Sequence, residues 1–311
     1  MYGQRSILEE LKNEFRSGNV LTQLIIINVA MFIAINFVHL ILFLSMGDRM
    51  LAAVKFDEVL SWLMIPADFM KLITRPWTII THMFAHQGFF HLLFNMLWLY
   101  WFGRILRDLT GNKMVLPLYI LGGLAGAALL IVSYNVFPVL AGELPYAKAL
   151  GASAGVMAIV IGTATLAPDY VMHLILIGPV RLKYIALFTL LLDVIGIPGP
   201  NTGGHIAHLG GALLGFVLVK QMQRGNDWSI SFHNFTNAVI AAFKPQNGPR
   251  MAYKNKKGKT TQATRKTSKA NFSKQEKIDQ ILDKISQSGY DSLTAEEKAF
   301  LFKASGEDND S

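Results

Sequence analysis

Two side chains in the apolar part of the chain have the chemistry of a nucleophile and its base. Ser153 stands among small residues in the run GASAG (151–155), and His208 stands in the glycine-rich run GHIAHLGG (204–211). A serine hydroxyl becomes a useful nucleophile only when a base takes its proton, and histidine is the most frequent base. A serine in an apolar helix more often serves helix packing, and a histidine there can bond to a carbonyl group, so both interpretations stay open at this point.

Further polar groups could bind the negative oxygen that forms when a nucleophile attacks a carbonyl group. His91 and Asn95 are four residues apart, which places them on one face of a helix. The backbone N–H of Ser153 is another donor, because the first N–H groups of a helix have no partner within it. These three donors are candidates for an oxyanion hole.

Other polar residues of the apolar region fit these roles less well. Ser133 lies near the end of another apolar run but lacks the small neighbours that would admit a substrate backbone. No Asp or Glu stands in a clear position to orient His208, and Asp193 is interpreted as a capped or hydrated carboxylate. The residues therefore predict a dyad of Ser153 and His208.

The elements that would position these residues are membrane helices. The chain has 311 residues, of which 52% are hydrophobic and 16% are charged, whereas about a quarter of the residues of a soluble domain are charged. Residues 20–222 are predominantly apolar, and residues 223–311 are mostly polar. The chain contains no cysteine, which excludes disulfides, zinc–thiolate sites and thiol catalysis. We expect an integral membrane protein with a polar tail.

The apolar region can hold six membrane spans of about 20 residues each with modest loops. We expect them at Leu21–Met46, His82–Phe102, Met114–Phe137, Ser153–Ala167, Tyr184–Ile197 and Gly204–Met222. The first run lacks a small-residue cleavage site, so it is interpreted as a retained span and not as a signal peptide. The loop 47–81 is long for a connector, and its aromatic residues suit the headgroup layer.

Lysine and arginine residues set the expected orientation. They gather before the first span, after the second and fourth spans, and in the tail. The loops after the third and fifth spans have almost none, and the long loop 47–81 is the exception to the pattern. Because cytoplasmic loops are enriched in these residues, both termini are expected in the cytoplasm. Ser153 and His208 would then lie near the outer ends of their helices.

Taken together, these residues resemble the rhomboid family of intramembrane serine proteases. The matching segments follow the order of the family, and they are Trp77, Thr81-His82, His86, the run HLLFN (91–95), the run GAS (151–153) and the run AHLGG (207–211). The resemblance covers roughly residues 20–222. It implies an all-α integral membrane protein whose six transmembrane helices form a rhomboid-like bundle.

The resemblance also implies roles for the polar residues. Ser153 would be the nucleophile, His208 the general base, and His91, Asn95 and the Ser153 amide the oxyanion hole. The substrates would be single-span membrane proteins, cut at or near the outer side of the membrane, and no cofactor or metal would be needed. His82 and His86 are interpreted as structural hydrogen-bonding groups and not as metal ligands. The compact six-span form suggests a bacterial inner membrane.

Three positions depart from the pattern of the family and favour an alternative. Ala154 stands where a glycine is usual, Met157 where an aromatic residue is frequent, and Thr78 where an arginine usually follows the tryptophan. The alternative is a catalytically inactive rhomboid-like protein that binds transmembrane segments without cutting them. A transporter would show interrupted helices in two related halves, and no such repeat is visible.

The tail continues the expected domain order. That order is a cytoplasmic segment at 1–20, a six-span domain at 21–222, a basic flexible linker at 223–274 and a small helical segment at 275–311. Residues 243–274 have many Lys and Arg but no Asp or Glu, so anionic lipid headgroups are the expected partner, with a merely solvated linker as the alternative. No nucleic acid is expected. In the last segment, Thr294 and Glu297 have the spacing of a helix capping box.

Overall fold

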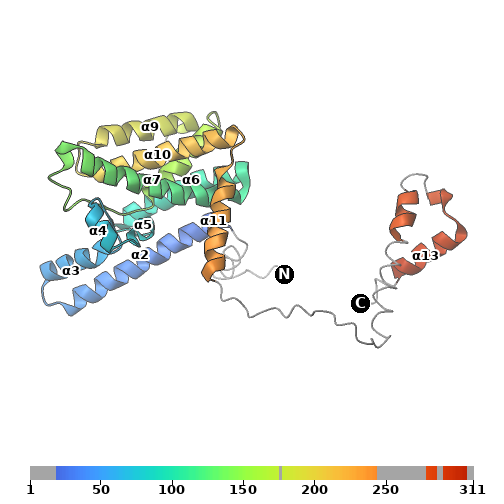
Figure 1. Ribbon diagram of the computed structural model, residues 1–311, viewed down its shortest axis with the longest axis horizontal. Helices are drawn as coiled ribbons and strands as arrows, with labels where there is room; N and C mark the ends of the chain where they lie inside the picture. Colours follow the sequence, from blue (N-terminus) through green and yellow to red (C-terminus); the bar gives the residue numbers. More distant parts are fainter. Residues whose placement is uncertain (1–18, 175–176, 244–277, 286–289, 307–311) are drawn as a thin grey trace. The chain divides into compact units, whose positions relative to one another are not determined.

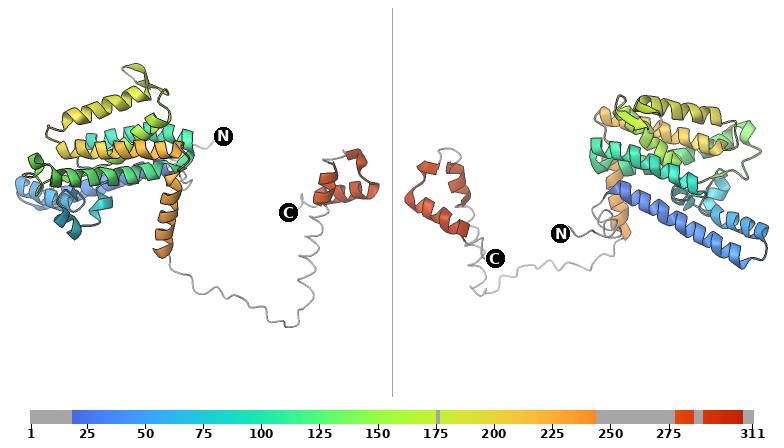
Figure 2. Two further views of the ribbon diagram at one scale, coloured as in Figure 1. Left: turned by 45° about the horizontal axis from the view of Figure 1, so that its top comes forward. Right: turned by 180° about the vertical axis from the view of Figure 1, so that it is seen from behind.

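The computed structural model describes residues 19–174, 177–243, 278–285 and 290–306. The chain forms two compact units, residues 1–244 and residues 245–311. The first unit contains the apolar helices, and the second contains the end of the polar tail (Figures 1 and 2). Almost all of the expected cytoplasmic segment at 1–20 lies outside the described residues.

Six apolar helices correspond to the six expected spans. Their bounds are Val20–Ser45 (α2), Phe89–Thr110 (α6), Val115–Val136 (α7), Ser153–Leu166 (α8), Leu182–Gly196 (α9) and Thr202–Gln223 (α10). Within the described part of the chain, α2, α6, α7 and α10 are long and apolar enough to cross a membrane. With 14 and 15 residues, α8 and α9 are shorter than the run of about 20 residues that a full crossing needs. The structure shows a mostly helical membrane protein, and the count of six crossings stays a prediction.

The second expected span begins later than the sequence predicts. His82 ends the short helix α5 (Thr78–Thr81), and His86 lies in the segment that follows it. Helix α6 starts only after Gly88, whose extended backbone forms its N-cap. A glycine inside a helix costs about 1 kcal/mol relative to alanine, so the boundary falls where the chain can use it as a cap. The prediction that His82 belongs to this span is wrong.

Helices α7, α8 and α10 pack with their backbones in close contact, because glycines line the surfaces that meet. A Cβ atom added to Gly211 or Gly215 of α10 would lie 2.0 or 2.2 Å from the carbonyl oxygen of Ala154 or Ala158 in α8. A Cβ atom added to Gly126 of α7 would lie 2.5 Å from the Cβ atom of Ala154. These glycines serve helix packing, and they hold the start of α8 between two neighbouring helices.

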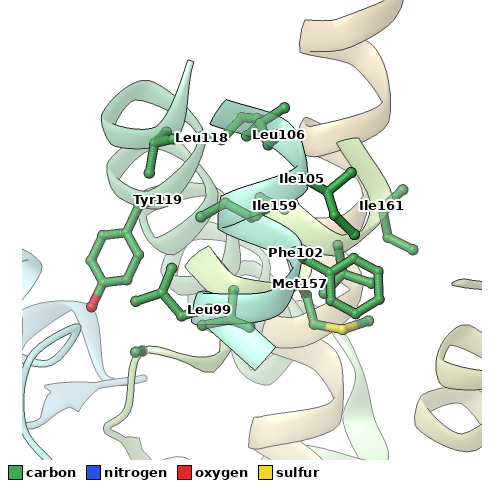
Figure 3. Packing of buried hydrophobic residues seen from close by; sticks show 14 of the residues in the cluster. Leu99, Phe102, Ile105, Leu106, Leu118, Tyr119, Met157, Ile159 and Ile161 are labelled. Carbon is green, nitrogen blue, oxygen red and sulfur yellow. The ribbon is translucent and has the colours of Figure 1, made fainter. Parts of the chain in front are cut away.

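Helix α8 is the centre of the largest apolar core. Nearly all of its residues are buried, as expected for a helix that neighbours surround. Side chains from α6, α7 and α8 pack together in this core, among them Leu99, Phe102, Ile105, Leu106, Leu118, Tyr119, Met157, Ile159 and Ile161 (Figure 3). By contrast, α9 exposes Leu187, Phe188 and Ile195. Exposed apolar surface of this extent suits contact with lipid.

A buried polar contact joins α2 to α7. The side-chain amide of Asn28 donates hydrogen bonds to the Leu24 carbonyl at 2.8 Å and to the Tyr119 hydroxyl at 3.0 Å. The Tyr119 hydroxyl lies 2.8 Å from the carbonyl oxygen of Met83, to which it donates. This contact agrees with the general use of polar residues between membrane helices.

The long loop 47–81 is folded and reaches the start of α8. It contains helix α3, strand β1 and helices α4 and α5, with bounds Arg49–Ser61, Ile65–Pro66, Phe69–Thr74 and Thr78–Thr81. Strand β1 pairs antiparallel with strand β2 (Lys148–Ala149), which lies just before α8. Trp62, Phe69 and Trp77 are exposed, which suits the expected place of this loop in the headgroup layer. The loop therefore helps to position the segment that leads into Ser153.

Residues 169–183, which the sequence predicts to be a loop, contain a β-hairpin. Strand β3 (Val171–Leu174) pairs antiparallel with strand β4 (Gly178–Arg181). At its base, Asp169 forms ion pairs with Lys183 at 2.7 Å and with Arg181 at 3.2 Å. The sequence did not indicate the two short sheets, β1–β2 and β3–β4, but the described fold is mostly helical, in agreement with the expected all-α class.

Helix α11 (Trp228–Phe243) lies in the segment 223–274 that the sequence predicts to be a flexible linker. Asp227 accepts hydrogen bonds from the backbone N–H and the hydroxyl of Ser229, at 2.9 and 2.6 Å, at the start of this helix. The His233 Nε2 atom donates to the carbonyl of Lys113 at 3.0 Å, which ties α11 to the turn between α6 and α7. Figures 1 and 2 show α11 running across the direction of α10. The linker prediction is wrong for these residues, and residues 244–274 lie outside the described part.

The described residues of the second unit contain two short helices. They are residues 278–285 and α13 (Ala295–Gly306), with the 3-10 turn η3 (Tyr290–Ser292) between them. The Thr294 N–H donates to Glu297 Oε2 at 2.8 Å, and the Glu297 N–H donates to Thr294 Oγ1 at 3.3 Å. This confirms the predicted capping box. Lys284 joins the two helices through an ion pair of 2.9 Å with Glu297.

Candidate active site

Ser153 lines a cavity of about 710 Å³ that α6, α8, α9 and α10 surround. All four residues that the sequence singles out line this cavity, namely His91, Asn95, Ser153 and His208. Ser153 and His208 are half-buried, His91 is exposed and Asn95 is buried. The fold thus brings together side chains from three helices that are far apart in the sequence.

Gly151 shows how closely His91 approaches Ser153. Its φ of +122° is one that residues with a side chain rarely adopt. A Cβ atom at this position would lie 2.8 Å from both Cε1 and Nε2 of His91 and 3.7 Å from the Ser153 Oγ atom. Only glycine fits here. Because it has no side chain, the His91 imidazole can lie close to the Ser153 hydroxyl.

The backbone just before Ser153 is held by the segment between α5 and α6. The Gly151 N–H donates to the His82 carbonyl at 2.8 Å, and the Ala152 N–H donates to His86 Nε2 at 3.3 Å. Burial, with a smaller effect of His91, lowers the pKa of His86 to about 4. The imidazole is therefore neutral at neutral pH, and its Nε2 lone pair is free to accept this bond. His82 and His86 thus have the structural role that the sequence predicts.

Asn95 lies one turn after His91 on the same face of α6. Its side-chain amide donates a hydrogen bond to the His91 carbonyl at 2.8 Å. An amide group has two N–H donors, so the second one remains for a group inside the cavity. His91, Asn95 and the backbone N–H of Ser153 thus offer donors to the cavity from two sides.

Asp193 of α9 contacts His208, the candidate base. This contact was not predicted from the sequence. The Oδ1 atom of Asp193 lies 2.8 Å from Nδ1 of His208 and 2.9 Å from Nδ1 of His205. The residue is only 6% exposed. The predictions that no carboxylate orients His208 and that Asp193 is merely capped or hydrated are therefore wrong. An ionisable residue within a membrane helix is costly and usually functional, and that rule was the signal available in the sequence.

Asp193, His205 and His208 are also the group of side chains, within the described residues, whose geometry could hold a metal ion. One candidate ligand atom from each lies within 4.8 Å of the others. Both imidazoles, however, are already at hydrogen-bonding distance from the same carboxylate oxygen. Hydrogen bonding accounts for the arrangement, and a metal ion would have to displace both bonds.

The three departures from the rhomboid pattern have local explanations in the structure. Ala154 packs its methyl group against Gly126, which leaves room for it. Met157 is buried in the core and also lines the cavity (Figure 3). Near Thr78, the guanidinium of Arg75 lies 4.2 Å from the ring centroid of Trp62 and bonds to the Ser61 hydroxyl at 3.2 Å. Arg75 therefore supplies a basic anchor for this loop.

The fold and the cavity define a helical membrane protein in which a serine and a histidine line one cavity between the helices. Residues 74–224 match the family model of the rhomboid domain, and residues 265–307 match a family of unknown function, DUF6576. Residues 74–224, which contain all the residues of the candidate site, thus form a domain of the rhomboid family.

Three curated proteins are similar to this chain, each at 28% identity. RHOMBOID-like protein 12, mitochondrial, of Arabidopsis thaliana matches over 49% of this chain and 48% of its own length. Presenilin-associated rhomboid-like protein, mitochondrial, of Bos taurus matches over 47% and 37%. Rhomboid-like protein 17, chloroplastic, of Arabidopsis thaliana matches over 45% and 47%. The matches thus span about half or less of these relatives, whose names place them in mitochondria or chloroplasts, so the expected bacterial inner membrane finds no support.

Proposed function

We propose that this protein is an intramembrane serine endopeptidase that cleaves membrane-spanning segments of other proteins. The observation that carries the proposal is the meeting of Ser153, His208 and His91 at one cavity between membrane helices. The rhomboid domain and the rhomboid-like relatives support the same class of activity. The residues have complementary chemistry, because a hydroxyl, a base and hydrogen-bond donors are the parts that acyl transfer requires.

The proposed mechanism follows from which nitrogen of the His208 ring is not already hydrogen-bonded. His208 engages Asp193 through Nδ1, so its Nε2 atom is the one left to take the proton of the Ser153 hydroxyl. The Ser153 oxygen then attacks the carbonyl carbon of the scissile bond, and the imidazolium gives its proton to the departing amine. A water molecule, with His208 again as base, hydrolyses the resulting ester. During both steps, His91, Asn95 and the Ser153 N–H would bind the oxyanion, and losing one such donor typically costs about 10²–10³ in rate.

The length of α8 supports a reaction within the membrane. With 14 residues, the helix is about 21 Å long at 1.5 Å per residue, whereas the hydrocarbon core is about 30 Å thick. If Leu166 lies near the cytoplasmic surface, Ser153 lies below the outer surface. Lys148 and Gln87 also line the cavity and offer a polar route for the water that hydrolysis needs.

The walls of the cavity favour an apolar substrate. Phe90, Phe94 and Trp98 of α6 line one part, and Leu192 of α9 lines another. A single-span membrane protein is therefore the proposed substrate. Its helix must unwind locally, because the backbone hydrogen bonds of an intact helix shield each peptide bond from attack.

The test compares the wild type with Ser153→Ala and His208→Ala, each purified in detergent and given an unstable single-span substrate. We expect the wild type to cleave and both variants to lose cleavage. Ser133→Ala is the matched control, because Ser133 is buried in α7 and does not line the cavity; it should still cleave. A wild type that is folded but leaves every such substrate intact would contradict the proposal.

The alternative is an inactive rhomboid-like protein that binds transmembrane segments. Met157 at the cavity wall favours it, since a methionine controls the position of an imidazole less firmly than an aromatic ring does. Such a protein would bind the substrate equally well in the wild type and in Ser153→Ala, without any product. Binding without cleavage therefore separates the two functions.

We also propose six crossings with both termini in the cytoplasm, and anionic lipid headgroups as the partner of the basic segment 243–274. The distribution of lysine and arginine supports both proposals. Binding to vesicles with and without anionic lipid, before and after removal of residues 245–311, tests the second. Equal binding of the full chain to both kinds of vesicle would contradict it.

A further inference from the structure

The carboxylate of Asp193 is shared between two imidazoles inside the bundle. The same oxygen, Oδ1, lies 2.8 Å from Nδ1 of His208 and 2.9 Å from Nδ1 of His205. A carboxylate can only accept such bonds, so each imidazole donates through a protonated Nδ1. This fixes the tautomer of His208, because a neutral imidazole with its proton on Nδ1 carries its lone pair on Nε2.

We propose that Asp193 is a positioning residue that holds His208 in the tautomer and orientation that the base for Ser153 requires. This inference rests on the proposed peptidase function. Asp193 does not take a proton itself. When His208 accepts the Ser153 proton, the imidazolium faces a carboxylate, and the pair is neutral as a whole.

The place of Asp193 argues against a purely incidental contact. It lies in α9 and His208 in α10, and the residue is 6% exposed. A carboxylate in this position is costly unless partners compensate it. Charged hydrogen bonds of this kind are about twice as strong as neutral ones, so the pair also fixes the spacing of the two helices near the cavity.

His205 has a supporting part in this arrangement. It is one helical turn before His208 and donates to the same oxygen of Asp193. A Cβ atom at Gly196 of α9 would lie 2.4 Å from His205 Nε2, so the absence of a side chain at Gly196 makes room for the ring. His205 therefore holds the carboxylate in place, whereas His208 is the imidazole that acts as the base for Ser153.

The kinetic test uses Asp193→Asn in the full-length protein with a cleavable single-span substrate. We expect kcat to fall by about 10²–10⁴, as when the orienting carboxylate of a serine-protease triad is replaced by an amide, with KM nearly unchanged. Asp169→Asn is the matched control, because Asp169 is an exposed carboxylate paired with Lys183 and Arg181 on the hairpin. It should leave kcat as in the wild type. An Asp193→Asn variant with the kcat of the wild type would overturn the proposal.

A second comparison separates positioning from a structural role. Asp193 acts through His208, so Asp193→Asn should not lower the residual labelling of Ser153 by a fluorophosphonate any further in a His208→Ala background. A structural role would lower it in both backgrounds by the same factor. That result would overturn the proposal even if the single variant were slow.

A spectroscopic readout remains valid if the peptidase function fails. Nitrogen NMR of histidine-labelled resting protein in detergent should show His208 as the tautomer with the proton on Nδ1, and Asp193→Asn should lose this preference. His208→Ala assigns the resonance. If neither the wild type nor Asp193→Asn cleaves the substrate but the tautomer of His208 still differs between them, the peptidase function is rejected and the positioning role of Asp193 is retained. An unchanged His208 tautomer in Asp193→Asn would reject the positioning role.

Discussion

At the scale of single residues, the site depends on positions that accept only one residue type. Gly151 has a φ of +122°, and a Cβ atom there would lie 2.8 Å from the His91 ring. Gly151→Ala should therefore displace His91 and lower the rate of Ser153 labelling by a fluorophosphonate, by about the 10²–10³ expected for one lost oxyanion donor. Gly142→Ala is the control, because a Cβ atom at Gly142 would meet nothing within 4 Å. Equal labelling of the two variants would contradict the assigned place of His91.

The buried histidines before α6 give the fold a dependence on pH. Burial lowers the pKa of His82 and of His86 to about 4, from about 6.5 in an unfolded chain. Between these values the unfolded chain binds more protons than the folded one. Stability is therefore complete above about pH 6.5 and falls as the pH falls toward 4, by up to about 1.4 kcal/mol per pH unit for each histidine.

His86→Gln tests this dependence. A glutamine carries no proton to bind, and its amide oxygen can still accept from the Ala152 N–H. Thermal unfolding of the wild type and the variant in detergent, between pH 7 and pH 4.5, should show a smaller loss of melting temperature for the variant. An equal loss of melting temperature in the wild type and the variant would mean that His86 does not contribute to the pH dependence of stability.

The role of Asp193 could not be derived from the sequence, although its presence in a span was visible. Ser153, His208, His91 and Asn95 were predictable because each stands in a short run with characteristic neighbours. The contact between Asp193 and His208 instead depends on how α9 and α10 pack, and the register between two helices does not follow from spacing along the chain.

At the scale of elements, most helix ranges were predictable from long apolar runs. The observed α7, α8, α9 and α10 begin and end close to the expected spans. The predicted start of α6 was too early, because Met83, Phe84 and Ala85 continue the apolar run toward the N-terminus. In the structure, this segment instead binds the backbone just before Ser153, through the His82 carbonyl and the His86 ring. The strands β1 and β2 join segments distant in sequence, so no local pattern indicated them.

Helix α11 is the element that sequence patterning could have revealed. Trp228, Phe232, Phe235 and Val239 recur at helical spacing and form one apolar stripe. Trp228 and Phe235 are 44% and 67% exposed, and the helix crosses the direction of α10 at the end of the bundle where Lys113 lies (Figure 1). We expect α11 to lie in the headgroup layer with this stripe toward the lipid tails.

The absence of cysteine from the chain makes this expectation easy to test. A fluorophore attached to Phe235→Cys in vesicles should be quenched by brominated lipid tails, whereas one attached to Asn237→Cys, on another side of the same helix, should be quenched by a water-soluble quencher. Aqueous quenching of both positions would contradict an interfacial place for α11.

At the scale of the whole molecule, the chain divides into a membrane unit and a tail unit. Residues 1–244 form a compact unit with all the residues of the candidate site, and residues 245–311 form another. Units with their own contacts can be separated without loss of the other fold. Removal of residues 245–311 should therefore leave Ser153 labelling in detergent within about twofold of the full chain. A large loss would show that the tail acts on the site.

The proposed function depends on the activation of Ser153 as a nucleophile by His208. The most direct measurement is the reaction of the purified protein with a fluorophosphonate, followed by mass spectrometry of its peptides. We expect one adduct, on Ser153, in the wild type, and only a small residual labelling of Ser153 in His208→Ala. A folded wild type without an adduct on Ser153, or with the adduct on Ser133, would contradict it.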